Sequence, residues 1–316
     1  ERIILNLPPI PFLIKKSKKV SFPGFQGLPL YDVVIFFNSQ MRQVGINERA
    51  AAIAFNFLLA IPPLGIFLFT VLSNIPGSAK LYKEVLHLAR QITPDNSTYR
   101  IIKSIADDFF KPGAELLSLG LFFAIYFSSN AMITIMRTFN KSMLHIEKEK
   151  RNFLQLRWEA IKLTILIVIL VIATILILVT QGTLMEKFKQ LLSIGKNEYN
   201  VLLEIIRFGL TFALIYFSIA LIYRYAPSLE KKWKFASPGV MLATILIIIV
   251  TYLFSYWVNN FARYNKVYGS LGSILILMLL VFFNSMVLLI GFELNVSINS
   301  LKSIARKRNQ AGQVKI

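Results

Sequence analysis

Long runs of apolar residues, separated by shorter polar segments, dominate the pattern along the chain. A bilayer core of about 30 Å needs roughly 20 mostly apolar residues in one helix, and six stretches reach that length. Each run alone could be a buried parallel strand, but the length of the runs favours helices. The pattern therefore predicts an all-α polytopic membrane protein with six transmembrane helices. The predicted spans cover residues 50–72, 116–135, 161–180, 205–223, 238–257 and 271–291.

Shorter helices are predicted outside the spans. Residues 31–44 combine an apolar face with a polar one, which is typical of an amphipathic helix lying in the membrane interface. In the first outer loop, apolar residues recur at helical spacing over 79–92 and again over 99–110. We expect these two helices to form a small cap, residues 79–110, over the outer mouth of the bundle. The alternative is that they lie flat at the outer interface.

Two prolines interrupt the first predicted span. Pro62 and Pro63 lie in its middle, where a proline removes a backbone donor and disfavours a continuous helix. The sequence therefore predicts a kink or a break there. A broken helix exposes backbone groups that can bind a substrate, and a simple packing kink is the structural alternative.

The distribution of basic residues predicts the orientation. Only 16% of the residues are charged and 55% are hydrophobic, yet the formal net charge is +19. About twice as many Lys and Arg residues lie in the segments on the side of the termini as in the loops on the other side. Because basic loops stay in the cytoplasm, both termini are predicted to be cytoplasmic. The predicted division is a cytoplasmic tail (1–30), a membrane domain (31–300) and a basic cytoplasmic tail (301–316).

The charge also bears on the partners of the protein. On a soluble chain a charge of +19 would suggest nucleic acid, but membrane topology already explains the bias. The predicted partners are therefore membrane lipids, anionic ones on the cytoplasmic side, and no nucleic acid. A small-molecule or lipid substrate is compatible with this picture. The sequence makes no prediction of the oligomeric state.

Candidate chemistry for an enzyme is sparse. The absence of cysteine excludes disulfides, thiolate metal sites and cysteine nucleophiles. The two histidines, His87 and His145, fall on opposite sides of the predicted membrane, and Asp107 and Asp108 are a weak acidic pair. There is no phosphate-binding loop, nucleophile elbow or dinucleotide motif. We therefore predict no catalytic residues, no metal site, no cofactor and no enzymatic activity.

Several short motifs resemble those of a known family. They are AAIAF at 51–55, RYAP at 224–227, SPG at 237–239, YNKVYGSLG at 264–272 and GFELN at 291–295. In this order they resemble the YihY/BrkB family of bacterial inner-membrane proteins, formerly labelled a ribonuclease family, over roughly residues 30–300. The chain departs from the family at 279–282, where LLVF replaces a stretch that often contains Trp. The resemblance implies a six-helix bacterial membrane protein and names no transport substrate.

Polar residues within the spans are candidate functional groups, because they are costly in a bilayer. Asn284 lies near the middle of the sixth span, where an interhelical hydrogen bond is the structural alternative. Glu293 lies toward the inner end of that span, two residues before Asn295. Its carboxylate is able to bind a cation, to relay protons, or to form a structural ion pair with Arg137 or Arg224.

These residues, with others on the inner side of the predicted spans, suggest a polar cavity that opens toward the cytoplasm. The predicted function is a transporter or a lipid- or amphiphile-handling membrane protein. The alternative is a membrane scaffold or interaction protein without transport. The candidate substrate-binding or transport residues are Asn56, Pro62, Pro63, Asn130, Arg137, Arg224, Asn284, Glu293 and Asn295, with Asn140 at the inner edge.

Overall fold

The structure is a computed structural model of the chain, and the residues that it describes are almost entirely helical. Within them, the only β-type pairing is an isolated bridge between Lys148 and Leu229. The predicted all-α class is therefore confirmed for these residues. The described residues are 15–18, 20–43, 45–73, 82–83, 86–87, 89–90, 96–109, 114–143, 146, 148–192, 196–261 and 270–313.

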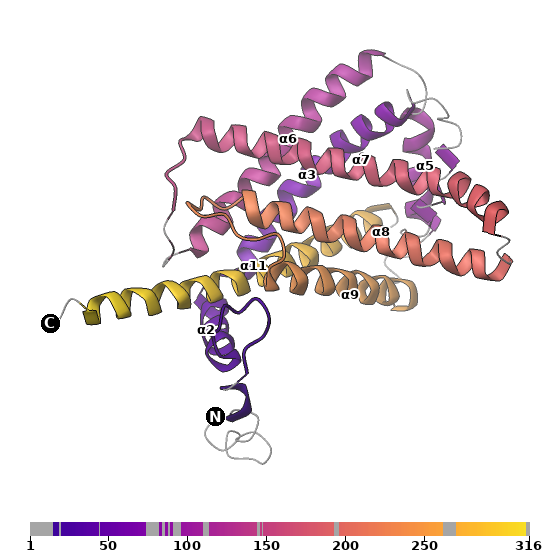
Figure 1. Cartoon of the computed structure of the whole chain (residues 1–316). Helices are drawn as coiled ribbons and strands as arrows, with labels where there is room; N and C mark the ends of the chain where they lie inside the picture. The colour runs from indigo at the N-terminus through magenta and orange to yellow at the C-terminus, as the bar shows by residue number, and fades with distance from the viewer. Residues whose placement is uncertain are drawn as a thin grey trace.

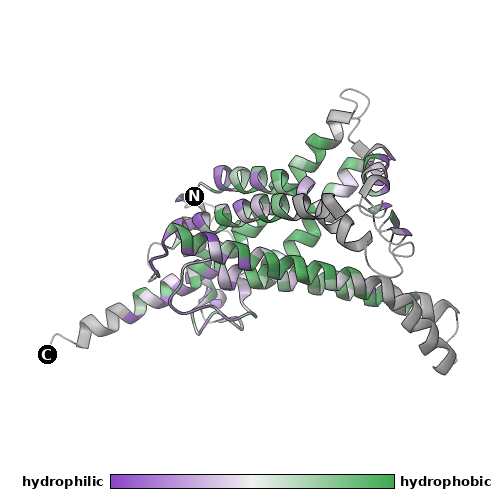
Figure 2. Cartoon of the chain, turned by 90° about the horizontal axis from the view of Figure 1, so that it is seen from above, coloured by the Kyte–Doolittle hydropathy of each residue, from purple (hydrophilic) through white to green (hydrophobic). Residues whose placement is uncertain are grey.

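Long helices form the body of the molecule (Figure 1). Helix α3 packs against α6 and α11, α9 packs against α11 and α8, and α7 lies between α6 and α8. Apolar residues line the middle of these helices, as lipid-facing and core-facing positions require (Figure 2). The long helices are α3 (Ile46–Ser73), α6 (Ala114–Ser142), α7 (Phe153–Leu192), α8 (Lys196–Tyr225), α9 (Pro238–Phe261) and α11 (Ser270–Gln313).

By length and composition, four helices are apolar enough to cross a membrane: Phe153–Ile175, Glu204–Tyr225, Pro238–Val258 and Ile274–Arg306. A fifth span results if Leu30–Gln43 and Ile46–Gly65 are counted as one bent element. These apolar helices agree with the membrane protein that the sequence predicts. The described residues thus give four or five spans, and the number six stays a prediction.

The predicted break at the two prolines is absent. Helix α3 runs without interruption from Ile46 to Ser73 through Pro62 and Pro63. A sharp change of direction lies earlier, where α2 (Leu30–Gln43) and the first part of α3 meet at 69°. Gly45 lies at this bend with φ of +61°, a conformation that glycine adopts at little cost. The break is therefore contradicted, whereas the alternative of a kink at these prolines stays a prediction.

Helix α2 packs against α11, in the orientation shown in Figure 1. Val33 of α2 is fully buried in a small apolar cluster with Phe25 and Ile298 of α11. The predicted amphipathic helix at 31–44 therefore exists, and its buried face covers α11. With the 69° bend, this contact sets the direction from which the chain enters α3.

Helix α5 (Asn96–Phe109) packs against α3 and α11 at the far end of the bundle from α2 (Figure 1). Tyr82 donates a hydrogen bond to Asp107 of α5, and this bond raises the pKa of Tyr82 to about 12. Most of the first predicted outer helix, 79–92, lies outside the described residues. The outer cap therefore stays a prediction.

At the opposite end, several segments rich in Lys and Arg meet, and we call this the basic end. The segment 146–152 is joined to 226–237 by a backbone hydrogen bond from Glu149 to Ser228, and Gln26 bonds to Asn299 of α11. The basic end consists of the described residues 15–18 and 20–29, α2, residues 146, 148–152 and 226–237, and the part of α11 that follows Asn295.

Candidate functional site

Two of the sequence motifs meet at one helix contact. The SPG motif (237–239) begins α9, and the GFELN motif (291–295) lies in α11. Asn295 accepts a hydrogen bond from the Gly239 backbone N–H at 2.9 Å and donates one to the Ser237 Oγ at 2.8 Å. This pair of bonds ties the first turn of α9, which has backbone N–H groups without intrahelical partners, to α11.

The two helices approach so closely because glycines face each other. A Cβ at Gly239 would overlap the carbonyl oxygen of Gly291, and a Cβ at Gly291 would lie 2.6 Å from the Cβ of Ala243. Small residues allow this kind of backbone contact between membrane helices.

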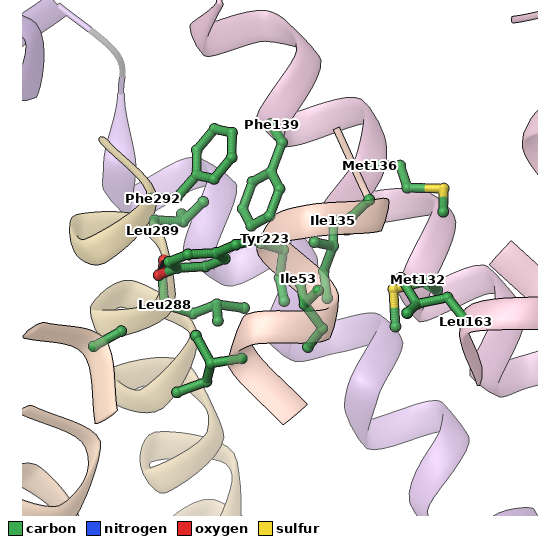
Figure 3. Packing of buried hydrophobic residues seen from close by; sticks show 14 of the residues in the cluster. Ile53, Met132, Ile135, Met136, Phe139, Leu163, Tyr223, Leu288, Leu289 and Phe292 are labelled. Carbon is green, nitrogen blue, oxygen red and sulfur yellow. Dashed lines mark hydrogen bonds between the residues drawn. The ribbon is translucent and has the colours of Figure 1, made fainter. Parts of the chain in front are cut away.

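An aromatic cluster fills the space beside this contact (Figure 3). The rings of Phe139 and Phe292 are stacked, with centroids 3.6 Å apart. Tyr223 meets both rings edge-on, and its hydroxyl donates to the Leu288 carbonyl at 2.6 Å. Trp233 also packs on Phe292, with ring centroids 5.3 Å apart. The cluster joins α6, α8 and α11 to the loop before α9.

Glu293 lies next to this cluster and is fully buried. Its Oε1 accepts a hydrogen bond from Ser142 Oγ at the end of α6. Arg49, near the start of α3, donates from Nη1 to the same Ser142 Oγ at 2.7 Å, and that nitrogen lies 3.7 Å from Glu293 Oε1. The Gln40 amide of α2 bonds to the Ser142 backbone oxygen at 3.2 Å. Four helices therefore meet around one carboxylate.

The second oxygen of this carboxylate is different. Oε2 of Glu293 is buried and has no hydrogen-bond partner among the described residues. An ionised carboxylate removed from water needs partners for both oxygens, or its burial costs several kcal/mol. Only one of the two carboxylate oxygens of Glu293 is therefore hydrogen-bonded, whereas a stable buried ion pair needs partners for both.

A groove of about 950 Å³ opens at the basic end. Asn295 and Asn299 of α11 lie along it, Ser237 and Pro238 mark the start of α9, and Trp233 adds an aromatic wall. Around these groups stand five basic side chains and one acidic one. The charged lining residues are Lys231, Lys232, Lys234, Lys302, Arg306 and Glu230.

The structure places the predicted site residues in separate contacts rather than in one cavity. Asn56 bonds to its own helix at Ala52, and Asn284 bonds to Thr251 of α9 and to Leu280. Pro62 is exposed on α3 and Pro63 is half-buried. Only Asn295 of the predicted set lines the groove.

The remaining predicted residues also have individual partners. Asn130 accepts a hydrogen bond from Arg157, and Asn140 exchanges two hydrogen bonds with Ser228. Arg224 donates to the Trp233 carbonyl at 3.2 Å and lies over the ring of Phe235. Arg137 is exposed.

The partner of Glu293 is therefore Arg49, rather than Arg137 or Arg224 as the sequence reasoning proposed. Arg49, Ser142 and Gln40 were not singled out from the sequence. Arg49 alone carried a signal in the sequence, because it is a charged residue directly before the first apolar run. A charged residue at the end of a membrane helix is able to face a neighbouring helix. Ser142 and Gln40 carried no such signal, because single polar residues near helix ends are common.

Catalytic metal chemistry finds little support in the described part of the chain. No group of three His, Asp or Glu side chains there lies close enough to hold a metal ion. A smaller cavity of about 510 Å³ next to the groove contains Glu149, Glu159 and Arg151. Arg151 bonds to Glu149 and to backbone carbonyls at the end of α8, so this region has a structural role.

The chain matches the model of one known protein family over most of its length. The family model described as "Virulence factor BrkB" matches residues 37–316. The chain belongs to the BrkB family. This confirms the resemblance seen in the sequence, and two of its motifs, at 237–239 and 291–295, meet beside the groove of this BrkB-family protein.

Individual relatives agree with this assignment. The putative ribonuclease-like protein YfkH of Bacillus subtilis is 29% identical over 263 residues, which cover 82% of this chain and 92% of that protein. A UPF0761 membrane protein of Tolumonas auensis is 25% identical over 254 residues, covering 79% of each chain. One from Chromohalobacter salexigens is 25% identical over 253 residues, covering 78% of this chain and 58% of that protein. No solved structure matches the chain.

Proposed function

We propose that this BrkB-family protein binds and handles an anionic amphiphile at the groove of the basic end, and that this end faces the cytoplasm of a bacterial inner membrane. The observation that carries the proposal is the groove itself. Its volume of about 950 Å³ is comparable to that of pockets that hold a small ligand, about 300–1,000 Å³.

The lining chemistry supports an anionic headgroup. Lys302 and Arg306 are four residues apart on α11, so their side chains follow the same face of the helix. The first turn of α9 also ends at the groove, and a helix N-terminus carries a partial positive charge that attracts anions. Trp233 offers an amphipathic ring of the kind that is common where headgroups meet apolar tails.

The test is lipid retention on the purified full-length protein. We expect the protein, extracted gently in native lipid, to carry an anionic lipid above its share in the bulk membrane, as measured by mass spectrometry. A double variant, Lys302→Gln with Arg306→Gln, should lose the enrichment by roughly tenfold or more, because each basic residue contributes about 1 kcal/mol to binding an anionic surface.

The matched control is Arg100→Gln with Lys103→Gln, which removes two exposed basic residues from α5 at the other end of the molecule. This control should keep the enrichment. Equal lipid content in all three proteins would contradict the proposal.

A membrane scaffold without transport is the second candidate. It is supported by the length of α11, whose 44 residues span about 66 Å at 1.5 Å per residue, roughly twice the bilayer core. The part beyond the bundle is therefore long enough to dock a partner. A protein that carries no enriched lipid, yet retains a protein partner only when residues 301–316 are present, would favour this function.

A further inference from the structure

The buried carboxylate of Glu293 lies outside the groove and has a charge that its neighbours compensate only in part. It is buried among four helices, with Ser142 bonded to Oε1 and nothing described bonded to Oε2. Arg49 lies 3.7 Å from Oε1, and its own hydrogen bonds go to Ser142 and the Thr138 backbone. The charge of the carboxylate is therefore only partly compensated.

A proton on Oε2 would complete the site. It would remove the uncompensated charge, while Oε1 would still accept the hydrogen bond from Ser142. A metal cation fits less well, because the Arg49 guanidinium already places a positive charge beside the carboxylate. The arrangement therefore suits a carboxyl group that exchanges a proton.

Arg49 is the more exposed member of the pair. Its side chain is 17% exposed, whereas that of Glu293 is 0% exposed. Among the described residues, the charged or titratable groups that face Glu293 are Arg49 from α3 and Tyr223 from α8. From α2 and α6 the facing groups are the neutral polar side chains of Gln40 and Ser142.

We propose that Glu293 is a proton-binding site, which takes up a proton from water at Oε2 and releases it again, and that its charge sets how firmly Arg49 holds α3 against α11. No other bond is made or broken in this exchange. When Glu293 is ionised, its attraction for Arg49 reinforces the contact; when it is protonated, Arg49 keeps only its bonds to Ser142 and Thr138. This proposal does not depend on the groove binding a lipid.

The bend gives the exchange a structural consequence. Arg49 lies four residues after Gly45, at which α2 and α3 meet at 69°. Gln40 ties α2 to the same Ser142 that Arg49 and Glu293 share. A weaker hold on Arg49 therefore loosens the bent pair α2–α3 as one unit against α6 and α11.

The direct test is infrared difference spectroscopy of the full-length protein in lipid nanodiscs, titrated between about pH 4 and about pH 9. We expect a protonated-carboxyl band that appears as the pH falls and that is lost in Glu293→Gln. Glu159→Gln, which removes a partly exposed carboxylate paired with Lys162, should keep the band. A band that survives in Glu293→Gln, or a Glu293 band that stays constant over this range, would overturn the proposal.

A second variant keeps the test valid if Glu293→Gln does not fold. Arg49→Gln leaves the carboxyl in place and removes the nearby positive charge. The Glu293 band should then persist to a pH higher by about 1 to 3 units, the usual effect of one adjacent opposite charge. An unchanged titration in Arg49→Gln would show that Arg49 does not sense the proton.

Hydrogen exchange tests the consequence. After correction for the intrinsic pH dependence of exchange, deuterium uptake in α2 and the first turns of α3 should rise as the pH falls. Glu293→Gln should show the raised uptake already at neutral pH, whereas uptake in α9 should not change. Uptake in α2 that is independent of pH and equal in both proteins would overturn the coupling to Arg49.

Discussion

At the scale of single residues, the contact between Gly239 and Gly291 leaves no room for a side chain at either glycine. A Cβ at Gly291 would lie 2.6 Å from Ala243 Cβ and 2.6 Å from the Tyr223 hydroxyl, both in packed helices. We predict that Gly291→Ala lowers the free energy of unfolding by about 1–3 kcal/mol, the usual cost of overpacking. The measurement is thermal or denaturant unfolding of the purified protein in detergent.

Gly209→Ala is the control for this prediction. Gly209 lies on an exposed face of α8, and nothing comes within 4 Å of a Cβ placed there. Alanine is a better helix former than glycine by about 1 kcal/mol, so this variant should be as stable as the parent or slightly more stable. Equal losses in the two variants would contradict the prediction.

Single residues of the site could be predicted from the sequence, but their partners could not. Glu293 and Asn295 could be recognised as candidates, because polar groups are rare in an apolar helix. The partner of Glu293 could not, because Arg49 lies 244 positions away and periodicity does not say which helices are neighbours. Arg137 was the wrong choice since it lies roughly 140° around α6 from Ser142, which bonds to Glu293.

At the scale of elements, the end of α8 depends on a residue from another segment. Arg151 donates to the backbone oxygens of Tyr225, Ala226 and Pro227 at 3.3–3.5 Å, where the helix has carbonyls without intrahelical partners. We predict that Arg151→Gln destabilises this end by about 1 kcal/mol, because the hydrogen bonds are charge-assisted but long. The measurement is hydrogen exchange in residues 222–230.

The neighbouring Lys150 provides the matched control. Its side chain is exposed, so Lys150→Gln changes the charge of the segment equally without removing a described contact to α8. Protection of residues 222–230 should stay at the parent level in this variant. A loss of protection as large as in Arg151→Gln would point to net charge rather than to capping.

The elements themselves were largely predictable, and their ends were not. The third predicted span, 161–180, lies inside α7, which begins at Phe153 and extends to Leu192. Hydropathy marks the part of a helix that suits lipid, whereas the backbone continues as a helix through polar turns on either side. A break at Pro62 and Pro63 is absent because membrane helices tolerate proline when neighbouring groups satisfy the freed carbonyls.

At the scale of the whole molecule, the sequence established the class and the family. The arrangement of helices was beyond it, because each contact between α3, α6 and α11 joins distant parts of the chain. The basic end is an intermediate case. Its charge was visible in the sequence, but the groove arises only because the loop 226–237 folds against α11.

The orientation of this end can be tested cleanly because the chain contains no cysteine. A single Lys231→Cys variant marks the basic end, and Lys103→Cys marks α5 at the opposite end; both parent side chains are exposed. Since basic segments remain on the cytoplasmic side, we predict that a membrane-impermeant maleimide labels the Lys103→Cys variant in intact spheroplasts. It should label the Lys231→Cys variant only after permeabilisation.

Either departure from this pattern has a definite meaning. Labelling of both variants from the same side would show that the two ends do not lie across the membrane from each other. A reversed pattern would place the groove outside the cell and remove the anionic cytoplasmic leaflet as the source of its ligand. The Arg49–Glu293 pair, which lies at the junction of α2 and α3 at the same end, would then also lie toward the outer side of the membrane.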